Sequence, residues 1–183
     1  MDNKILNTIS WKVINKYFED NDLALTNHHI ESYDDFFDNG IKQIFAETNP
    51  IKVRKNFDNK LDDFRYKLDI FIGGKEGKDI YYGQPVIYEK HNHYMYPNEA
   101  RLKNMTYATT IHYDVDVVCT VIDKVSHEEI TLEKTFSKIF FGKFPILLHS
   151  KLCVLNNLPQ SVAFQMGECK NDKGGYFIID GKE

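Results

Sequence analysis

The chain has 183 residues, 42% of them hydrophobic and 14% aromatic, which is enough to build one buried core of ordinary domain size. Its formal net charge of -4 excludes a global positive field that would attract nucleic acid, so any such contact must come from a local basic patch. No apolar run approaches the roughly 20 residues of a membrane span, no signal peptide is evident, and three irregularly spaced cysteines form neither a disulfide framework nor a zinc pattern. We therefore expect an intracellular chain that forms one domain over residues 1–183.

Two helices are predicted before residue 50. In the segment 10–18, apolar side chains recur at helical spacing, and Ser10 is placed to cap the first turn. A second helix is predicted at 30–46, with an apolar stripe formed by Tyr33, Phe36, Phe37, Ile41, Ile44 and Phe45. The Asn-Pro pair at 49–50 is expected to end it.

The middle of the chain has a pattern typical of strands and turns. Short strands are predicted at 67–72, 80–82 and 86–88, separated by Gly and Pro. The glycine-rich loop at 73–79 superficially resembles a phosphate-binding loop. Such a loop needs wider spacing between its glycines and a Ser or Thr after its Lys, whereas an aspartate follows Lys78 here. The loop is therefore interpreted as a tight turn.

The second half is predicted to be mostly strand. After a helical or irregular stretch at 96–104, alternating apolar residues indicate a long half-buried strand at 107–122. The run 130–141 is expected to pair with it in antiparallel fashion through a connection at 126–129. A last strand is predicted at 174–179. The fold class is therefore α+β, with N-terminal helices packed on a mainly antiparallel sheet.

Two side-chain combinations suggest chemistry, each with a simpler alternative. Because side chains alternate along a strand, His112, Asp114 and Asp116 would share one face and could hold a divalent metal, but a solvent-facing strand has the same pattern. Cys153 with His149 could form a nucleophile and base, although no orienting group or oxyanion motif accompanies them. The sequence therefore predicts no metal site and no catalytic residue.

Basic residues gather in the C-terminal half, where they could contact phosphates if the fold brings them to one side. A solvated surface balanced by neighbouring acids explains them equally well. The residues that we assign to nucleic-acid contact are Arg101, Lys103, Lys143, Lys151 and Lys182.

Several strings resemble one protein family and occur in its order. They are SWKVI and YF within 10–18, HHIESYDDF at 28–36, YPNEARLKNMTY at 96–107, FGKFPILLHSKLC at 141–153, and GEC followed by DKGGYFIIDGKE within 167–183. They resemble the N-terminal part of the second-largest subunit of multisubunit DNA-directed RNA polymerases, in its eukaryotic, archaeal and viral branch. Asp180 stands where the family pattern has Asn.

The resemblance implies the first part of the protrusion, an α+β domain beside the DNA cleft, with the lobe and later domains absent. It also implies DNA-templated RNA synthesis by the assembly, with this chain as cleft wall and scaffold. No cofactor is expected on the chain itself, and Mg²⁺ would be held by the largest subunit of the assembled polymerase. The expected partners are that subunit, the remainder of the second-largest subunit and, through the complex, DNA. The location would be the nucleus for a cellular polymerase, and the host cytoplasm or virion for a viral one.

Two alternatives remain open at this point. The chain could be a stand-alone product of a split or degraded polymerase gene, acting as a non-catalytic binding module. It could also be an enzyme by itself, using the face of His112, Asp114 and Asp116. As a fragment, it is expected to leave apolar surface and the edge of its last strand, after 175–179, exposed.

Overall fold

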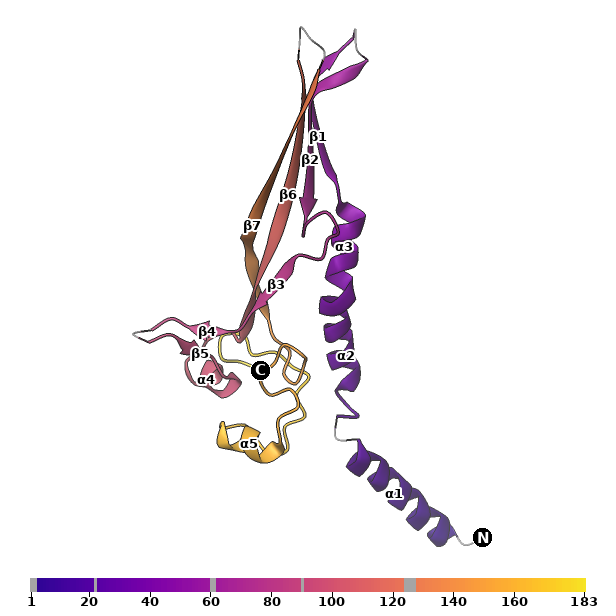
Figure 1. Cartoon of the computed structure of the whole chain (residues 1–183). Helices are drawn as coiled ribbons and strands as arrows, with labels where there is room; N and C mark the ends of the chain where they lie inside the picture. Colours follow the sequence, from indigo (N-terminus) through magenta and orange to yellow (C-terminus); the bar gives the residue numbers. More distant parts are fainter. Residues whose placement is uncertain (1–2, 22, 60–61, 90, 124–127) are drawn as a thin grey trace. The chain divides into compact units, whose positions relative to one another are not determined.

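A computed structural model describes residues 3–21, 23–59, 62–89, 91–123 and 128–183 (Figure 1). The chain divides into two compact units, which are considered separately. The first unit comprises Met1–Asp34, Tyr96–Tyr107 and Ile146–Glu183, and the second comprises Asp35–Met95 and Ala108–Pro145. The helices and strands together confirm the α+β class, and every strand pairing is antiparallel. A single domain over 1–183 stays a prediction.

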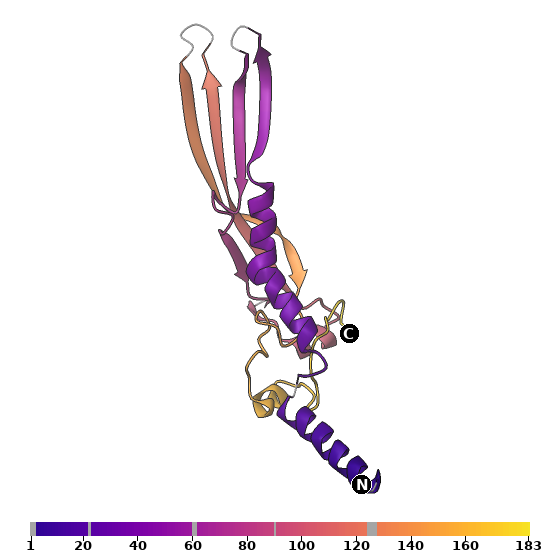
Figure 2. The ribbon, with the colours of Figure 1, turned by 90° about the vertical axis from the view of Figure 1, so that its right-hand side faces the viewer.

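The second unit is built on a five-stranded sheet. Its strand order is β1-β2-β6-β3, and β7 pairs with the other edge of β6. Figure 2 shows β1, β2, β6 and β7 side by side. The strands are β1 (Ile51–Asp58), β2 (Asp63–Ile72), β3 (Ile80–Gly83), β6 (Ala108–Ile122) and β7 (Glu129–Pro145), and a separate small sheet pairs β4 (Val86–Ile87) with β5 (His93–Tyr94). The predicted pairing of the two long strands is confirmed, while residues 126 and 127 of the predicted connection lie outside the described residues.

One face of this sheet is covered at one end by helix. The π-helical turn η1 (Phe36–Gly40) and α3 (Ile41–Thr48) follow each other along the chain. The Phe45 ring lies 6.0 Å from that of Tyr113, and the Phe37 ring lies 5.3 Å from that of Phe144. Because side chains alternate along strands, Tyr113 and its cross-strand partner Ile139 share the helix-covered face.

The glycine-rich loop is a tight turn, as predicted. The backbone N–H groups of Gly73 and Gly74 donate to the Asp114 carbonyl at 2.8 and 3.2 Å, and Asp79 N–H donates to the Gly73 carbonyl at 2.9 Å. Gly73 and Gly74 have φ angles of 72° and 75°, a region that favours glycine. These amides therefore bond within the protein, to the turn itself and to the neighbouring strand β6 (Ala108–Ile122).

The first unit contains helices and irregular backbone. Its helices are α1 (Asn3–Asp20), α2 (Asn27–Asp35, of which Asp35 falls in the second unit), α4 (Pro97–Leu102) and α5 (Gln160–Gln165). Backbone hydrogen bonds link its segments: Tyr107 N–H donates to the Ile178 carbonyl at 3.0 Å, and Ile146 N–H donates to the Tyr107 carbonyl at 2.9 Å. These three side chains are fully buried together with Leu148 and Leu155, so the core of the unit lies where the chain segments meet.

The predicted helix at 30–46 is confirmed, with helical backbone from Asn27 to Thr48 that contains the π-helical turn η1 between α2 and α3. Two other expectations about local structure are wrong. The first helix begins at Asn3, so Ser10 is internal and its hydroxyl donates to the Leu6 carbonyl at 2.9 Å instead of capping. The predicted strand at 174–179 is not a strand, and only an isolated bridge joins Ile179 to Lys182.

The reason for the last error is that the segment's backbone groups are satisfied by single bonds to separate partners. The Tyr176 carbonyl accepts from Leu148 N–H at 3.0 Å, and the Ile178 carbonyl accepts from Tyr107 N–H. Because this described segment is not a strand, it has no strand edge; Ile178 is fully buried, whereas Ile179 is 48% exposed. Among the described helices, none is long and apolar enough to cross a membrane.

Candidate functional site

Two of the family-like strings meet in the first unit around one arginine. Arg101, on α4, donates through Nη1 to both carboxylate oxygens of Glu168, at 2.9 and 3.1 Å. Its Nε lies 2.6 Å from Glu183 Oε1, and its Nη2 lies 2.9 Å from the Tyr176 hydroxyl and 3.8 Å from Asp172. These five residues are called the Arg101 cluster.

Burial distinguishes the contacts within the Arg101 cluster. The side chains of Arg101 and Glu168 are 18% and 4% exposed, whereas that of Glu183 is 54% exposed. Burial by itself lowers the pKa of the guanidinium, but the carboxylates of Glu168 and Glu183 outweigh this and raise it above its ordinary value. Arg101 is therefore permanently charged, and the cluster holds chain segments together instead of transferring protons.

A tight turn brings the end of the chain to the cluster. Ile179 and Lys182 exchange backbone hydrogen bonds of 2.9 and 3.0 Å around Asp180 and Gly181, whose φ angles are 50° and 75°. Positive φ at both central residues is the type I′ geometry, which favours Asn-Gly or Asp-Gly. The departure of Asp180 from the family-like Asn therefore keeps the turn. A Cβ on Gly181 would lie 2.8 Å from the Cα of Asn104, so glycine is required there.

The Cys153 thiol is buried in the core of the first unit. Tyr107 donates its hydroxyl to Cys153 Sγ at 3.9 Å and accepts from Val154 N–H at 3.1 Å. Burial raises the pKa of the thiol and also that of the Tyr107 phenol. A buried, protonated thiol is a poor nucleophile, so this geometry favours a structural role.

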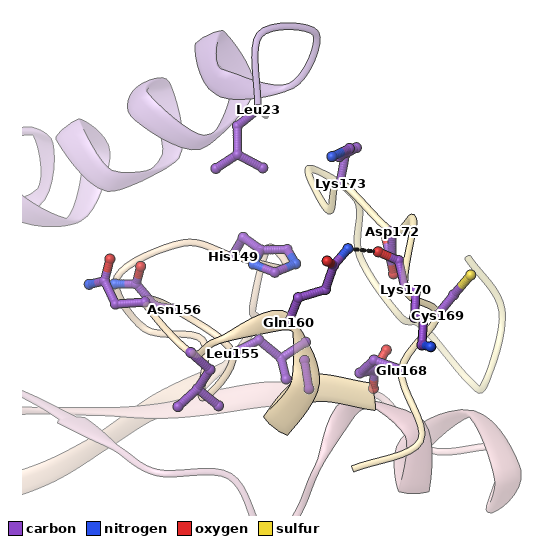
Figure 3. Close-up of a pocket in the computed structure, with 13 residues that line it drawn as sticks. Leu23, His149, Leu155, Asn156, Gln160, Glu168, Cys169, Lys170, Asp172 and Lys173 are labelled. Atoms are coloured by element: carbon purple, nitrogen blue, oxygen red, sulfur yellow. Dashed lines mark hydrogen bonds between the residues drawn. The ribbon is translucent and has the colours of Figure 1, made fainter. Parts of the chain in front are cut away.

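A cavity of about 280 Å³ lies beside the Arg101 cluster within the first unit (Figure 3). Leu155 and His149 both line this cavity. The His149 imidazole, which was considered as a base for Cys153, therefore faces the cavity. Glu168 and Lys170 also line it. Acids and lysines are mixed around the space, and we assign it no ligand.

The five basic residues assigned to nucleic-acid contact do not all fall in one unit. Arg101, Lys103, Lys151 and Lys182 belong to the first unit, and Lys143 lies on β7 in the second. Lys103 Nζ lies 3.0 Å from a Glu99 carboxylate oxygen. The backbone N–H of Lys151 donates to Asp34 at 2.9 Å. Contact of these side chains with nucleic acid stays a prediction.

The face of β6 that was weighed as a possible metal site, and not predicted to be one, has partners within the protein. Asp114 accepts hydrogen bonds from Lys138 N–H at 2.7 Å and from the Tyr81 hydroxyl at 3.2 Å. Asp116 accepts one from a threonine of β7 at 2.6 Å. Within the described ranges, no group of three His, Cys, Asp or Glu side chains is placed to hold a metal ion. Asp114 instead fixes an irregularity of the β6–β7 ladder, where the register shifts between Tyr113 and Val115.

A row of three rings was missed by the sequence reasoning. Tyr81 on β3 and Phe140 on β7 each lie directly opposite His112 on the central strand β6. We call these three residues the aromatic row. The three rings come from segments that are far apart in the sequence, and they are aligned only by the order and register of the strands. No local sequence signal could therefore have identified the aromatic row.

Comparisons with known proteins agree with the strings. A family model described as RNA polymerase beta subunit matches residues 24–183. DNA-directed RNA polymerase II subunit 2 of Arabidopsis thaliana is 34% identical over 188 residues, covering 100% of this chain and 15% of that protein. Subunit RPB2 of Schizosaccharomyces pombe is 32% identical over 94% of this chain and 15% of its own length. The Rpo2N subunit of Methanothermobacter thermautotrophicus is 30% identical over 98% of this chain and 30% of its own length. The chain thus spans well under half of these relatives.

Proposed function

The chain belongs to the RNA polymerase beta-subunit family, and we propose that it serves as the N-terminal protrusion part of a second-largest subunit. In that role it forms a wall of the DNA cleft and a scaffold for DNA-templated RNA synthesis. The partners are the largest subunit and the remainder of the second-largest subunit. The similarity over its full length to a subunit of RNA polymerase II, together with the archaeal relative, supports this role.

The observation that carries a scaffold role is the apolar face of the second unit. Register places Val117, Cys119 and Val121 of β6 on the same face as the helix-covered Tyr113. Their partners on β7 include Leu132, which is 63% exposed. Other large apolar side chains on this face are also exposed, namely Val53, Tyr66, Ile130 and Phe136. Lys55 and Lys134 lie on the same face, and a largely apolar exposed surface of this kind is typical of a docking surface.

The chemistry of nucleotide addition is assigned to the assembly. The conspicuous ionisable groups of the chain are engaged in its own structure, with Arg101 in its cluster and Asp114 at the strand irregularity. We place the Mg²⁺ ions of the reaction in the largest subunit, where they would stabilise charge on the reacting phosphates. The chain would act in the nucleus for a cellular polymerase, or in the host cytoplasm or virion for a viral one.

Copurification tests this function. The tagged chain is expected to copurify with a largest polymerase subunit when expressed in its source. Leu132→Asp, on the apolar face, should abolish copurification because it buries a charge at the interface. Thr131→Asp is the matched control, since it places the same charge one residue away on the opposite face of β7. Recovery of the chain without any polymerase subunit, or equal behaviour of the two variants, would contradict the proposal.

A further inference from the structure

The second unit has an open sheet face that carries the aromatic row. Tyr81, His112 and Phe140 stand side by side across β3, β6 and β7, and the last two rings have centroids 5.6 Å apart. Tyr81 and Phe140 are 42% and 57% exposed. The row thus has an exposed ring on each side of the half-buried His112, although aromatic side chains usually bury most of their area.

This face is opposite the one that the helical segment covers. Tyr113 is the residue after His112, and Ile139 is the residue before Phe140. Because side chains alternate along a strand, Tyr113 and Ile139 point to the helix-covered side, where the Tyr113 ring contacts Phe45. An antiparallel sheet with helix on one face and exposed rings on the other is the arrangement by which some RNA-binding domains stack bases.

Two exposed lysines flank the aromatic row. Lys138 Nζ lies 5.9 Å from the centre of the Tyr81 ring, within the range of a cation–π contact. Lys143 pairs with Thr110, which is two residues before His112 on β6 and therefore on the same face. Rings that can stack on bases and cations that can meet phosphates are thus brought together by strand register.

The nearest acid on this face helps to position the row. Asp114 lies two residues after His112, and its two carboxylate oxygens accept from Lys138 N–H and from the Tyr81 hydroxyl. The latter bond orients the Tyr81 ring. Because the Asp114 charge would repel a phosphate, the backbone of a bound strand is expected on the Lys143 side of the row.

We propose that the aromatic row binds unpaired bases of single-stranded nucleic acid, with Lys143 contacting its phosphates and Lys138 held over the Tyr81 ring beside Asp114. Stacking on rings is largely independent of base identity, so the surface should show little sequence preference. Of the five basic residues assigned to nucleic-acid contact from the sequence, this site includes only Lys143. It is a property of this chain's own surface and does not depend on polymerase assembly.

The test is fluorescence anisotropy of a labelled oligothymidylate of about 12 nucleotides with the full chain at low salt. Phe140→Ala is expected to weaken binding by about 5- to 100-fold, the loss of one stacked base. Phe141→Ala is the matched control: this neighbour is 63% exposed, but its ring meets Tyr113 on the helix-covered side. It should bind like the unmodified chain.

The salt dependence of binding tests the contribution of Lys143 separately from stacking. Lys143→Ala should reduce the slope of log affinity against log salt by about 0.7, the value for one phosphate contact on a single strand. Circular dichroism of each variant checks that it is folded. Absence of saturable binding by the unmodified chain, equal losses in Phe140→Ala and Phe141→Ala, or equal affinity for duplex and single strand would overturn the proposal. None of these results would alter copurification, so the two proposals can fail independently.

Discussion

Neutralising Glu168 should destabilise the first unit far more than neutralising Glu183, although both carboxylates bind the same guanidinium. Glu168→Gln retains the shape of the side chain and creates no cavity, but leaves Arg101 without its buried partner. Glu183→Gln makes the same chemical change at the exposed contact. The pair therefore separates the effect of burial from that of hydrogen bonding.

The expected losses of stability follow from how exposed each carboxylate is. Removing one partner of a buried ion pair costs about 3–5 kcal/mol, and the lower end applies because Arg101 keeps Asp172 and Glu183 nearby. An ion pair with one partner more than half exposed contributes about 0–1 kcal/mol. For a chain of this size, about 3 kcal/mol lowers the melting temperature by roughly 6–12 °C. Glu183→Gln should lower it by no more than about 4 °C.

The assay must report on the first unit's core. The single tryptophan, Trp11, is exposed on α1, so its fluorescence is a poor probe. Hydrogen exchange of the Tyr107 amide, which donates to the Ile178 carbonyl, follows opening of the core directly. Glu168→Gln should accelerate this exchange by about 100-fold, consistent with about 3 kcal/mol. If Glu183→Gln has an equal or larger effect, burial does not govern the cluster and the reasoning fails.

Three further predictions concern the same unit. Gly181→Ala should lower stability by more than about 1 kcal/mol in urea unfolding because of the positive φ and the backbone contact, whereas Asp180→Asn should be neutral. Cys169, which is exposed, should react with a thiol reagent in the folded chain, and buried Cys153 only after unfolding; equal rates would contradict the assigned burial. Because burial raises the pKa of Tyr107 above its ordinary 10.0, the folded state holds this proton more tightly, so the contribution of this group to stability is fully present below about pH 10 and is lost as pH rises above it. Tyr107→Phe should make the alkaline decline shallower without removing it, because burial also raises the pKa of Tyr33 and Tyr176, and unfolding at successive pH values measures this.

Local patterns were sufficient for much of the fold. Alternation in 107–122 correctly predicted the long strand, because a half-buried strand repeats every two residues whatever it pairs with. The glycine turn was also correct, since positive φ is a local requirement. Segment 174–179 was misassigned because its apolar run resembles a strand, and Ile178 is indeed buried, but its backbone groups bond to separate partners and not to one neighbouring strand. Burial of a side chain therefore does not distinguish a strand from an irregular segment.

The sequence by itself determined the family, through strings in a fixed order, and the α+β class, through two periodicities that depend only on neighbouring residues. Only the tertiary structure decided the side-chain partners. Arg101 meets Glu168 and Glu183 across separations of 67 and 82 residues, and no periodicity records contacts of that range. The aromatic row likewise exists only because β3 and β7 flank β6 in one register, and a shift of one residue would turn its rings to the other face.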